Sequence, residues 1–131
     1  MAEKTIDIAS PILSRNERLA DQLRQRFKET GTYVINVLSS PGSGKTTTIL
    51  GTNERLRDKA GLRCAVIEGD IASDVDAITM KEAGMPAIQI NTGGLCHLEG
   101  NMIMEAVDAF DQAVGLENID VIFIENVGNL V

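Results

Sequence analysis

Cysteine is scarce in this sequence, which contains only Cys64 and Cys96 among its 131 residues. Two cysteines cannot form the disulfide framework that stabilises small secreted domains. We therefore expect the chain to work in a reducing compartment, the cytoplasm.

Positive charge is also scarce, because 12 lysines and arginines face 19 aspartates and glutamates and the net charge is −7. A general DNA- or RNA-binding surface needs a basic face, so nucleic acid is not an expected partner. A nucleotide is not excluded, because a pocket needs only local hydrogen-bond donors.

Long hydrophobic runs are missing. No apolar stretch approaches the roughly 18 residues that suggest a membrane-spanning helix, and the opening "MAEKTIDIAS" lacks the apolar centre of a signal peptide. We therefore expect no membrane partner.

Strand and helix patterns alternate along the chain, whose length predicts one domain over residues 1–131. Ser14 and Glu17 have the spacing of a capping box, and Leu19, Leu23 and Phe27 form one apolar stripe of the first helix. We expect helices at 14–31, 45–61, 73–84 and 101–115, and strands at 33–38, 63–70, 86–91 and 119–128. The alternation predicts an α/β fold with a mainly parallel sheet flanked by helices, on which the N-terminal segment 1–31 packs. The run "YVINVL" is almost continuously apolar, which is typical of a strand buried on both faces.

Polar clusters follow the expected strands. They comprise residues 39–46, the run Glu68-Gly69-Asp70, the pair Cys96 and His97, and residues 125–128. In open parallel sheets, ligands bind beyond the carboxyl ends of the strands. We therefore expect these clusters to meet at one edge of the sheet.

The first cluster, "SSPGSGKT", has the character of a phosphate-binding loop. Gly44-Lys45-Thr46 match the end of the pattern G-x-x-x-x-G-K-[ST], whereas Ser39 replaces its first glycine. Glycines let successive N–H groups point at phosphate oxygens, and the N-terminus of the following helix adds a positive dipole end. We expect Lys45 to neutralise the β- and γ-phosphates and the hydroxyl of Thr46 to bind Mg²⁺. The residues expected to contact the phosphates are Pro41, Gly42, Ser43, Gly44, Lys45, Thr46 and Thr47, with Gly128 at the end of the last strand.

Two acidic residues at strand ends are candidates for completing the magnesium site. Asp70 and Glu125 both follow apolar runs, and Mg²⁺ prefers oxygen ligands. Asp70 could instead cap the next helix, and Glu125 could be a solvated charge. Asp74 and Asp76 fit better as charges in the first turn of a helix.

The adjacent residues Cys96 and His97 offer a thiolate and an imidazole, which suit Zn²⁺ or Ni²⁺. Two ligands do not complete a site, but a twofold dimer would supply four. The alternative is a loop histidine beside a half-buried cysteine. Cys64 fits better as a core residue, and so do Met80, Met85, Met102 and Met104.

Taken in order, the segments "VLSSPGSGKTTTI", "VIEGDI", "INTGGLCHLEG" and "VIFIENVGNLV" resemble the hydrogenase nickel incorporation GTPases of the HypB family, and "ILSRNERLADQLRQRF" resembles their N-terminal helix. Ser39 is part of that family's form of the loop. The resemblance implies a P-loop GTPase that binds GTP with Mg²⁺, with Lys45, Asp70 and Glu125 as catalytic residues. It also implies a homodimer that shares a zinc or nickel site at Cys96 and His97, and that works with a nickel chaperone and a [NiFe]-hydrogenase precursor.

The same resemblance predicts that the C-terminal strands and helices of the domain are missing. In the family, a Cys-Pro pair and a guanine-reading Asn-Lys-x-Asp motif follow the segment that ends here at Val131. The alternatives are a nucleotide- and metal-binding module without base selectivity or turnover, and another P-loop NTPase, either urease-type or kinase-like. A sheet without its last strands would also expose the edge of the fourth strand or of its neighbour.

Overall fold

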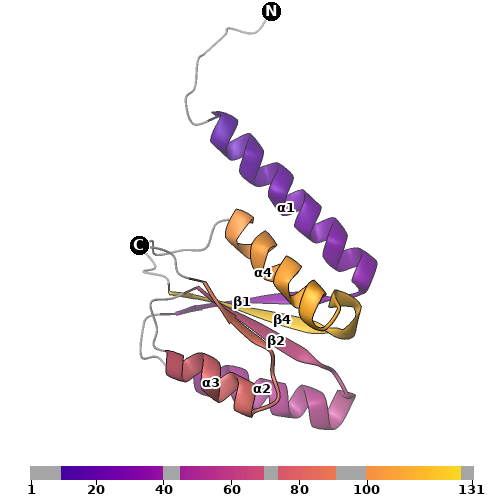
Figure 1. Cartoon of the computed structure of the whole chain (residues 1–131), viewed down its shortest axis with the longest axis vertical. Coiled ribbons are helices and arrows are strands. Elements are labelled where there is room, and N and C mark those ends of the chain that lie inside the picture. Colours follow the sequence, from indigo (N-terminus) through magenta and orange to yellow (C-terminus); the bar gives the residue numbers. More distant parts are fainter. Residues whose placement is uncertain (1–9, 40–44, 70–73, 91–99, 128–131) are drawn as a thin grey trace, which may run out of the picture.

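A computed structural model describes residues 10–39, 45–69, 74–90 and 100–127 of the chain (Figure 1). Helices and strands alternate along it. The elements are α1 (Ser10–Thr30), β1 (Tyr33–Ser39), α2 (Lys45–Ala60), β2 (Cys64–Gly69), α3 (Asp74–Glu82), β3 (Ala87–Gln89), α4 (Gly100–Ala113), the 3-10 helix η1 (Leu116–Asn118) and β4 (Val121–Val127).

The four strands form one parallel sheet in the order β1-β4-β2-β3. The strand β4 lies between β1 and β2, and its register aligns Val121 with Tyr33 on one side and with Cys64 on the other. All carboxyl ends therefore lie at one edge of the sheet, as the sequence predicts.

The helices form one layer on each face of the sheet. In Figure 1, α1 and α4 lie on one side and α2 and α3 on the other. Because side chains alternate between faces along a strand, Ile67 and Ile122 pack toward α1 and α4, while Val66 and Phe123 pack on the opposite side with Ile49 of α2. The core is thus divided by the sheet into two apolar clusters.

The central strand β2 is buried along its whole length, as expected for a parallel strand. For β1 the expected burial on both faces is wrong. Tyr33 is 75 % exposed and Ile35 is 42 % exposed, because β1 lies at the sheet edge and pairs only with β4 among the described strands. The described sheet has β1 and β3 at its two edges, and the exposed edge expected near the fourth strand is that of its neighbour β1.

The N-terminal helix starts earlier than expected. It begins at Ser10, so Ser14 lies inside the helix and the predicted capping box is wrong. Pro11 is compatible with this earlier start, because proline is tolerated in the first turn of a helix. The side chains of Leu23 and Phe27 are buried against the core, which confirms the apolar stripe.

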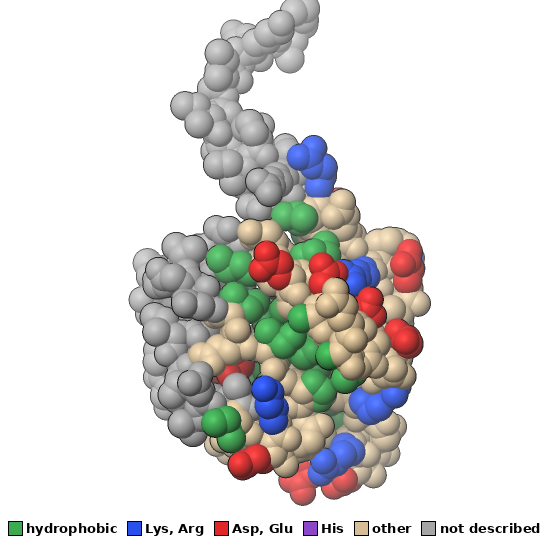
Figure 2. Space-filling model, viewed as in Figure 1, with side chains coloured by type: hydrophobic (Ala, Val, Ile, Leu, Met, Phe, Trp, Pro, Cys, Tyr) green, Lys and Arg blue, Asp and Glu red, His purple; other side chains and the backbone are tan. Residues whose placement is uncertain are grey.

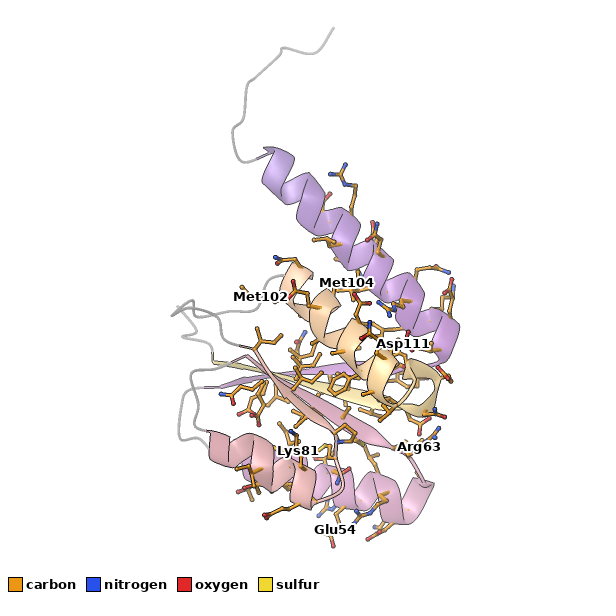
Figure 3. The ribbon with its side chains drawn as sticks, viewed as in Figure 1. Glu54, Arg63, Lys81, Met102, Met104 and Asp111 are labelled. Atoms are coloured by element: carbon orange, nitrogen blue, oxygen red, sulfur yellow. The ribbon has the colours of Figure 1, made fainter. Side chains whose placement is uncertain are left out.

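Polar contacts also fasten α1 to α4. The guanidinium of Arg26 donates hydrogen bonds to the carboxylates of Asp108 and Asp111, and Asp111 is labelled on α4 in Figure 3. The hydrogen bond to Asp108 and the negative charge of both carboxylates raise the pKa of Arg26. The pKa of Asp111 is lowered, mainly by the hydrogen bond that the backbone N–H of Leu116 donates to it and to a smaller extent by the contact with Arg26. The helix packing is therefore held by both apolar and ionic contacts.

Two further expectations change at the ends of elements. The third strand is shorter than predicted and spans only Ala87–Gln89. Val114, which the helix expected at 101–115 would include, follows the end of α4 and is 41 % exposed, because the chain turns at Gly115 with a φ of 84°. Met80, Met85 and Cys64 are buried core residues, as expected.

Candidate nucleotide and metal site

The segments that carry the predicted site all follow the carboxyl ends of strands. Residues 40–44 connect β1 to α2, residues 70–73 connect β2 to α3, and residues 91–99 lead from the β3 region to α4. The parallel order of the sheet therefore brings together segments that are far apart in the sequence.

The predicted phosphate loop has the strand–loop–helix setting that its pattern requires. Ser39 is the last residue of β1, and Lys45 and Thr46 are the first two residues of α2. Their side chains, and residues 40–44 with Pro41, Gly42, Ser43 and Gly44, lie outside what the structure describes. Thr47 stands exposed in the first turn of α2.

Glu125 is the predicted site residue whose side chain is best placed by the structure. It lies near the carboxyl end of β4 and is only 6 % exposed. In register beside it, on β2, lies Glu68, which is 1 % exposed. Adjacent strands lie about 4.8 Å apart, so the two carboxylates are buried next to each other. The alternative of a solvated charge at Glu125 is therefore wrong.

The alternation of side chains shows where these carboxylates point. Glu68 lies two residues after Val66, and Glu125 two residues after Phe123, and both apolar residues face α2 and α3. Both glutamates thus face the side of the sheet on which α2 begins with Lys45. A buried acidic pair and a lysine at a helix N-terminus share one corner of the fold.

The remaining predicted site residues, Asp70, Cys96, His97 and Gly128, fall outside the described residues. Within the described ranges there is no cluster of three or more histidine, cysteine or acidic residues that could hold a metal ion.

This corner suits a ligand that combines phosphate oxygens with a divalent cation. Buried carboxylates are retained in proteins where they are paired or coordinate a metal, and a helix N-terminus favours anions. On the face shown in Figure 2, acidic and basic side chains are interspersed over the described residues, with no continuous basic field. The arrangement therefore favours a local phosphate–cation site over a broad polyanion-binding surface.

Sequence reasoning placed Glu68 at this edge but gave it no role. Its only signal is an acidic residue at the end of a continuously apolar strand. A second feature was missed entirely, at the opposite edge of the sheet. There, Asn53 interrupts the apolar face that Ile49 and Leu56 form on α2, and it is 6 % exposed.

Comparison with known proteins gives consistent matches. Residues 33–131 match the family described as CobW/HypB/UreG, nucleotide-binding domain. The hydrogenase/urease maturation factor HypB of Helicobacter hepaticus is 44 % identical over 129 residues, which cover 98 % of this chain and 52 % of that protein.

Two solved structures share the fold. The crystal structure of HypB from Helicobacter pylori in complex with nickel has a TM-score of 0.77 and 41 % identity, covering 88 % of this chain and 52 % of that one. The hydrogenase maturation factor HypB of Archaeoglobus fulgidus has a TM-score of 0.76 and 35 % identity, covering 90 % and 54 %. The chain thus spans about half the length of these relatives. Among the described residues, no helix is long and apolar enough to cross a membrane.

Proposed function

Because the chain belongs to the CobW/HypB/UreG family of nucleotide-binding domains, we propose that it binds GTP with Mg²⁺ between β1 and α2. In this proposal, the backbone from Pro41 to Thr47 surrounds the phosphates, and the ammonium of Lys45 neutralises their charge. Gly128, which directly follows β4, lies beside the same phosphates. The observation that carries the proposal is the buried pair Glu68 and Glu125, which faces the helix that Lys45 begins.

The chemistry of the donors fits Mg²⁺. Glu125 supplies a carboxylate from β4, Asp70 follows β2 by one residue, and Thr46 offers a hydroxyl at the start of α2. Bound magnesium would neutralise negative charge on the β- and γ-phosphates. We propose that Lys45, Asp70 and Glu125 act together in hydrolysis of GTP to GDP and phosphate.

Nucleotide binding can be measured as protection against thermal unfolding. Mg²⁺–GTP at about 100 times its dissociation constant should add roughly 2.7 kcal/mol of stability. Lys45→Ala should remove most of this gain. Lys59→Ala is the matched control, because Lys59 is an exposed lysine in the last turn of the same helix. An unchanged GTP response in Lys45→Ala would refute the phosphate site.

The matching family is described as a nucleotide-binding domain without a named base, which also fits a second candidate, a module that binds phosphates without selecting guanine or turning over. A titration of GTP against ATP, with phosphate release measured in parallel, separates the two. A tenfold preference for GTP, equivalent to about 1.4 kcal/mol, together with phosphate release would support the GTPase. Equal affinities without release would support the module.

We further propose that Cys96 and His97 bind Ni²⁺ or Zn²⁺ in a site shared by a homodimer. The function is then to hand nickel, with a nickel chaperone, to a [NiFe]-hydrogenase precursor. The support is that the Helicobacter hepaticus relative is named a hydrogenase/urease maturation factor and that the Helicobacter pylori HypB structure is a complex with nickel.

The metal site is tested by equilibrium dialysis of Ni²⁺ and Zn²⁺. We expect about one metal per dimer and an affinity that falls with acidity, because both ligands must lose a proton. Cys96→Ala should abolish binding. Cys64→Ala should not, because burial, with a smaller effect of Asp120, raises the pKa of the Cys64 thiol to about 11 and keeps it protonated. Equal metal affinity in Cys96→Ala and the parent would place the site elsewhere.

A further inference from the structure

The edge of the sheet opposite the nucleotide corner contains a cavity of about 280 Å³. It lies where β2 begins, between α2, the turn before β3 and η1. Its walls include the apolar side chains of Leu62, Cys64 and Ile119 and the polar side chains of Asn53, Arg57 and Arg63. We call it the amino-edge cavity. Its volume equals that of roughly nine water molecules, which is enough for a small organic ligand.

Asn53 is the first sign that this cavity has a polar occupant. The residue is buried, with 6 % of its surface exposed, and it lines the cavity from the sheet-facing side of α2. Within the described part of the chain, no hydrogen bond is made by its amide. The amide of Asn53 is open to the cavity. A polar group of a ligand can therefore replace water as its hydrogen-bonding partner there.

Charge at the cavity wall is the second sign. The two charged residues of its lining are Arg57 and Arg63, although the whole chain has a net charge of −7. Arg57 uses one N–H to bind the carbonyl of Ala83 at 3.2 Å, and its Nε lies 3.6 Å from a carboxylate oxygen of Asp58. Arg63, which lies at the start of β2 (Figure 3), uses Nε and Nη1 for Asp120 and Asn118 at 3.4 and 3.3 Å. Each guanidinium has five N–H donors, so both keep donors for an anion.

A groove next to the amino-edge cavity is less suitable for an anion. It has a volume of about 450 Å³ and shares Asn53 and Arg57 with the amino-edge cavity, but it also carries Glu54 and Glu82. These carboxylates oppose an anion there, whereas the described residues that line the smaller cavity include no acidic one. The anion therefore belongs in the smaller cavity.

From this geometry we propose that the amino-edge cavity binds a small carboxylate with an apolar body. The carboxylate lies between Arg57 and Arg63, the apolar body contacts Leu62 and Ile119, and the amide of Asn53 bonds to a polar atom of the ligand. The site is separate from the nucleotide corner, because the two lie at opposite ends of the parallel strands.

Benzoate is the probe for this proposal, and benzamide is its uncharged counterpart of the same shape. Amide signals of the ¹⁵N-labelled 131-residue chain are followed by NMR during titration. We expect saturable shifts for residues around the cavity with benzoate and none with benzamide. The dissociation constant should be about 1 mM, within the range of affinity per atom that small ligands reach.

The double variant Arg57→Gln/Arg63→Gln should weaken benzoate about tenfold. Both side chains are more than half exposed, at 55 % and 58 %, so the core is retained. Arg55→Gln is the matched control, because Arg55 lies on the same helix but lines a groove on its outer surface, and its affinity should be unchanged. Asn53→Leu should weaken binding further, because it removes the amide and narrows the cavity.

Three results would overturn the proposal. They are benzamide binding as tightly as benzoate, unchanged benzoate affinity in the double variant, and the absence of saturable shifts at about ten times the expected dissociation constant. The nucleotide titrations of Lys45→Ala test a site at the opposite edge of the sheet. Failure of the carboxylate-binding proposal can therefore be distinguished from failure of the nucleotide-binding proposal.

Discussion

Replacing Asn53 by leucine should stabilise the folded chain, although most substitutions of buried residues destabilise proteins. Asn53 is a buried residue on the sheet-facing side of α2, one turn after the buried Ile49. The amino-edge cavity of about 280 Å³ lies beside it and gives the larger leucine side chain room. The change therefore replaces the amide of Asn53 by an apolar group without crowding the core.

The magnitude follows from three contributions. The amide of Asn53 is open to the cavity, and a leucine side chain that becomes buried there contributes about 1.5–3 kcal/mol. Leucine adds a few tenths of a kcal/mol through its higher helix propensity. Imperfect packing of a new side chain takes back about 1 kcal/mol. We expect a net gain of about 1–2 kcal/mol in the free energy of unfolding.

The measurement is urea unfolding followed by circular dichroism. With a slope of about 1–3 kcal/mol per molar urea, the midpoint should rise by roughly 1 M. Asn53→Ala separates the contributions, because alanine has the highest helix propensity but leaves the cavity empty. The leucine variant should be more stable than the alanine variant. A leucine variant less stable than the parent would refute the reasoning, since it would show that the amide has a partner that stabilises the fold.

The remaining predictions concern a turn, a helix contact and a thiol. Gly115→Ala should lower the free energy of unfolding by about 1–2 kcal/mol, because Gly115 has a φ of 84° and an added Cβ would lie 2.7 Å from the Glu117 carboxylate. Gly51→Ala, at a position inside α2 where an added Cβ has nothing within 4 Å, should instead raise it by up to about 1 kcal/mol. Equal effects of the two changes would contradict the strained turn at Gly115. Arg26→Gln should speed hydrogen exchange in α1 while β2 stays protected, and Arg24→Gln, whose partner Asp21 is in the same helix, should not. Because burial raises the pKa of Cys64 from 9.0 to about 11, the folded state holds a proton that the unfolded state has lost. Its contribution to stability is complete below pH 9 and disappears as pH rises toward 11, so urea midpoints of the parent should fall over this range more than those of Cys64→Ala.

The sequence predicted the order and type of every major element. Apolar runs such as that of β2 and the stripe of Leu23 and Phe27 are local patterns, and their burial in the structure confirms them. The parallel sheet followed from the alternation of those elements. The resemblance to HypB proteins is confirmed by the family match and by relatives of 44 % and 41 % identity.

Predictions that depended on neighbours in space failed. The apolar run of β1 predicted that Tyr33 and Ile35 are core residues, but β1 is an edge strand and nothing in the described chain covers them. The spacing of Ser14 and Glu17 predicted a helix cap at Ser14, but the helix already begins at Ser10. A local pattern cannot show which strand lies at the edge, or how far a helix extends past a possible cap.

The sequence by itself determined the α/β class, the glycine–lysine–threonine loop between a strand and a helix, and the acidic residues at strand ends. Tertiary structure alone decided that β4 inserts between β1 and β2, so that Glu125 is buried beside Glu68. It also decided that Asn53, Arg57 and Arg63 surround one cavity. The physical reason is that sequence periodicity fixes the face on which a side chain lies, whereas strand order and the packing of helices on the sheet fix what that face meets.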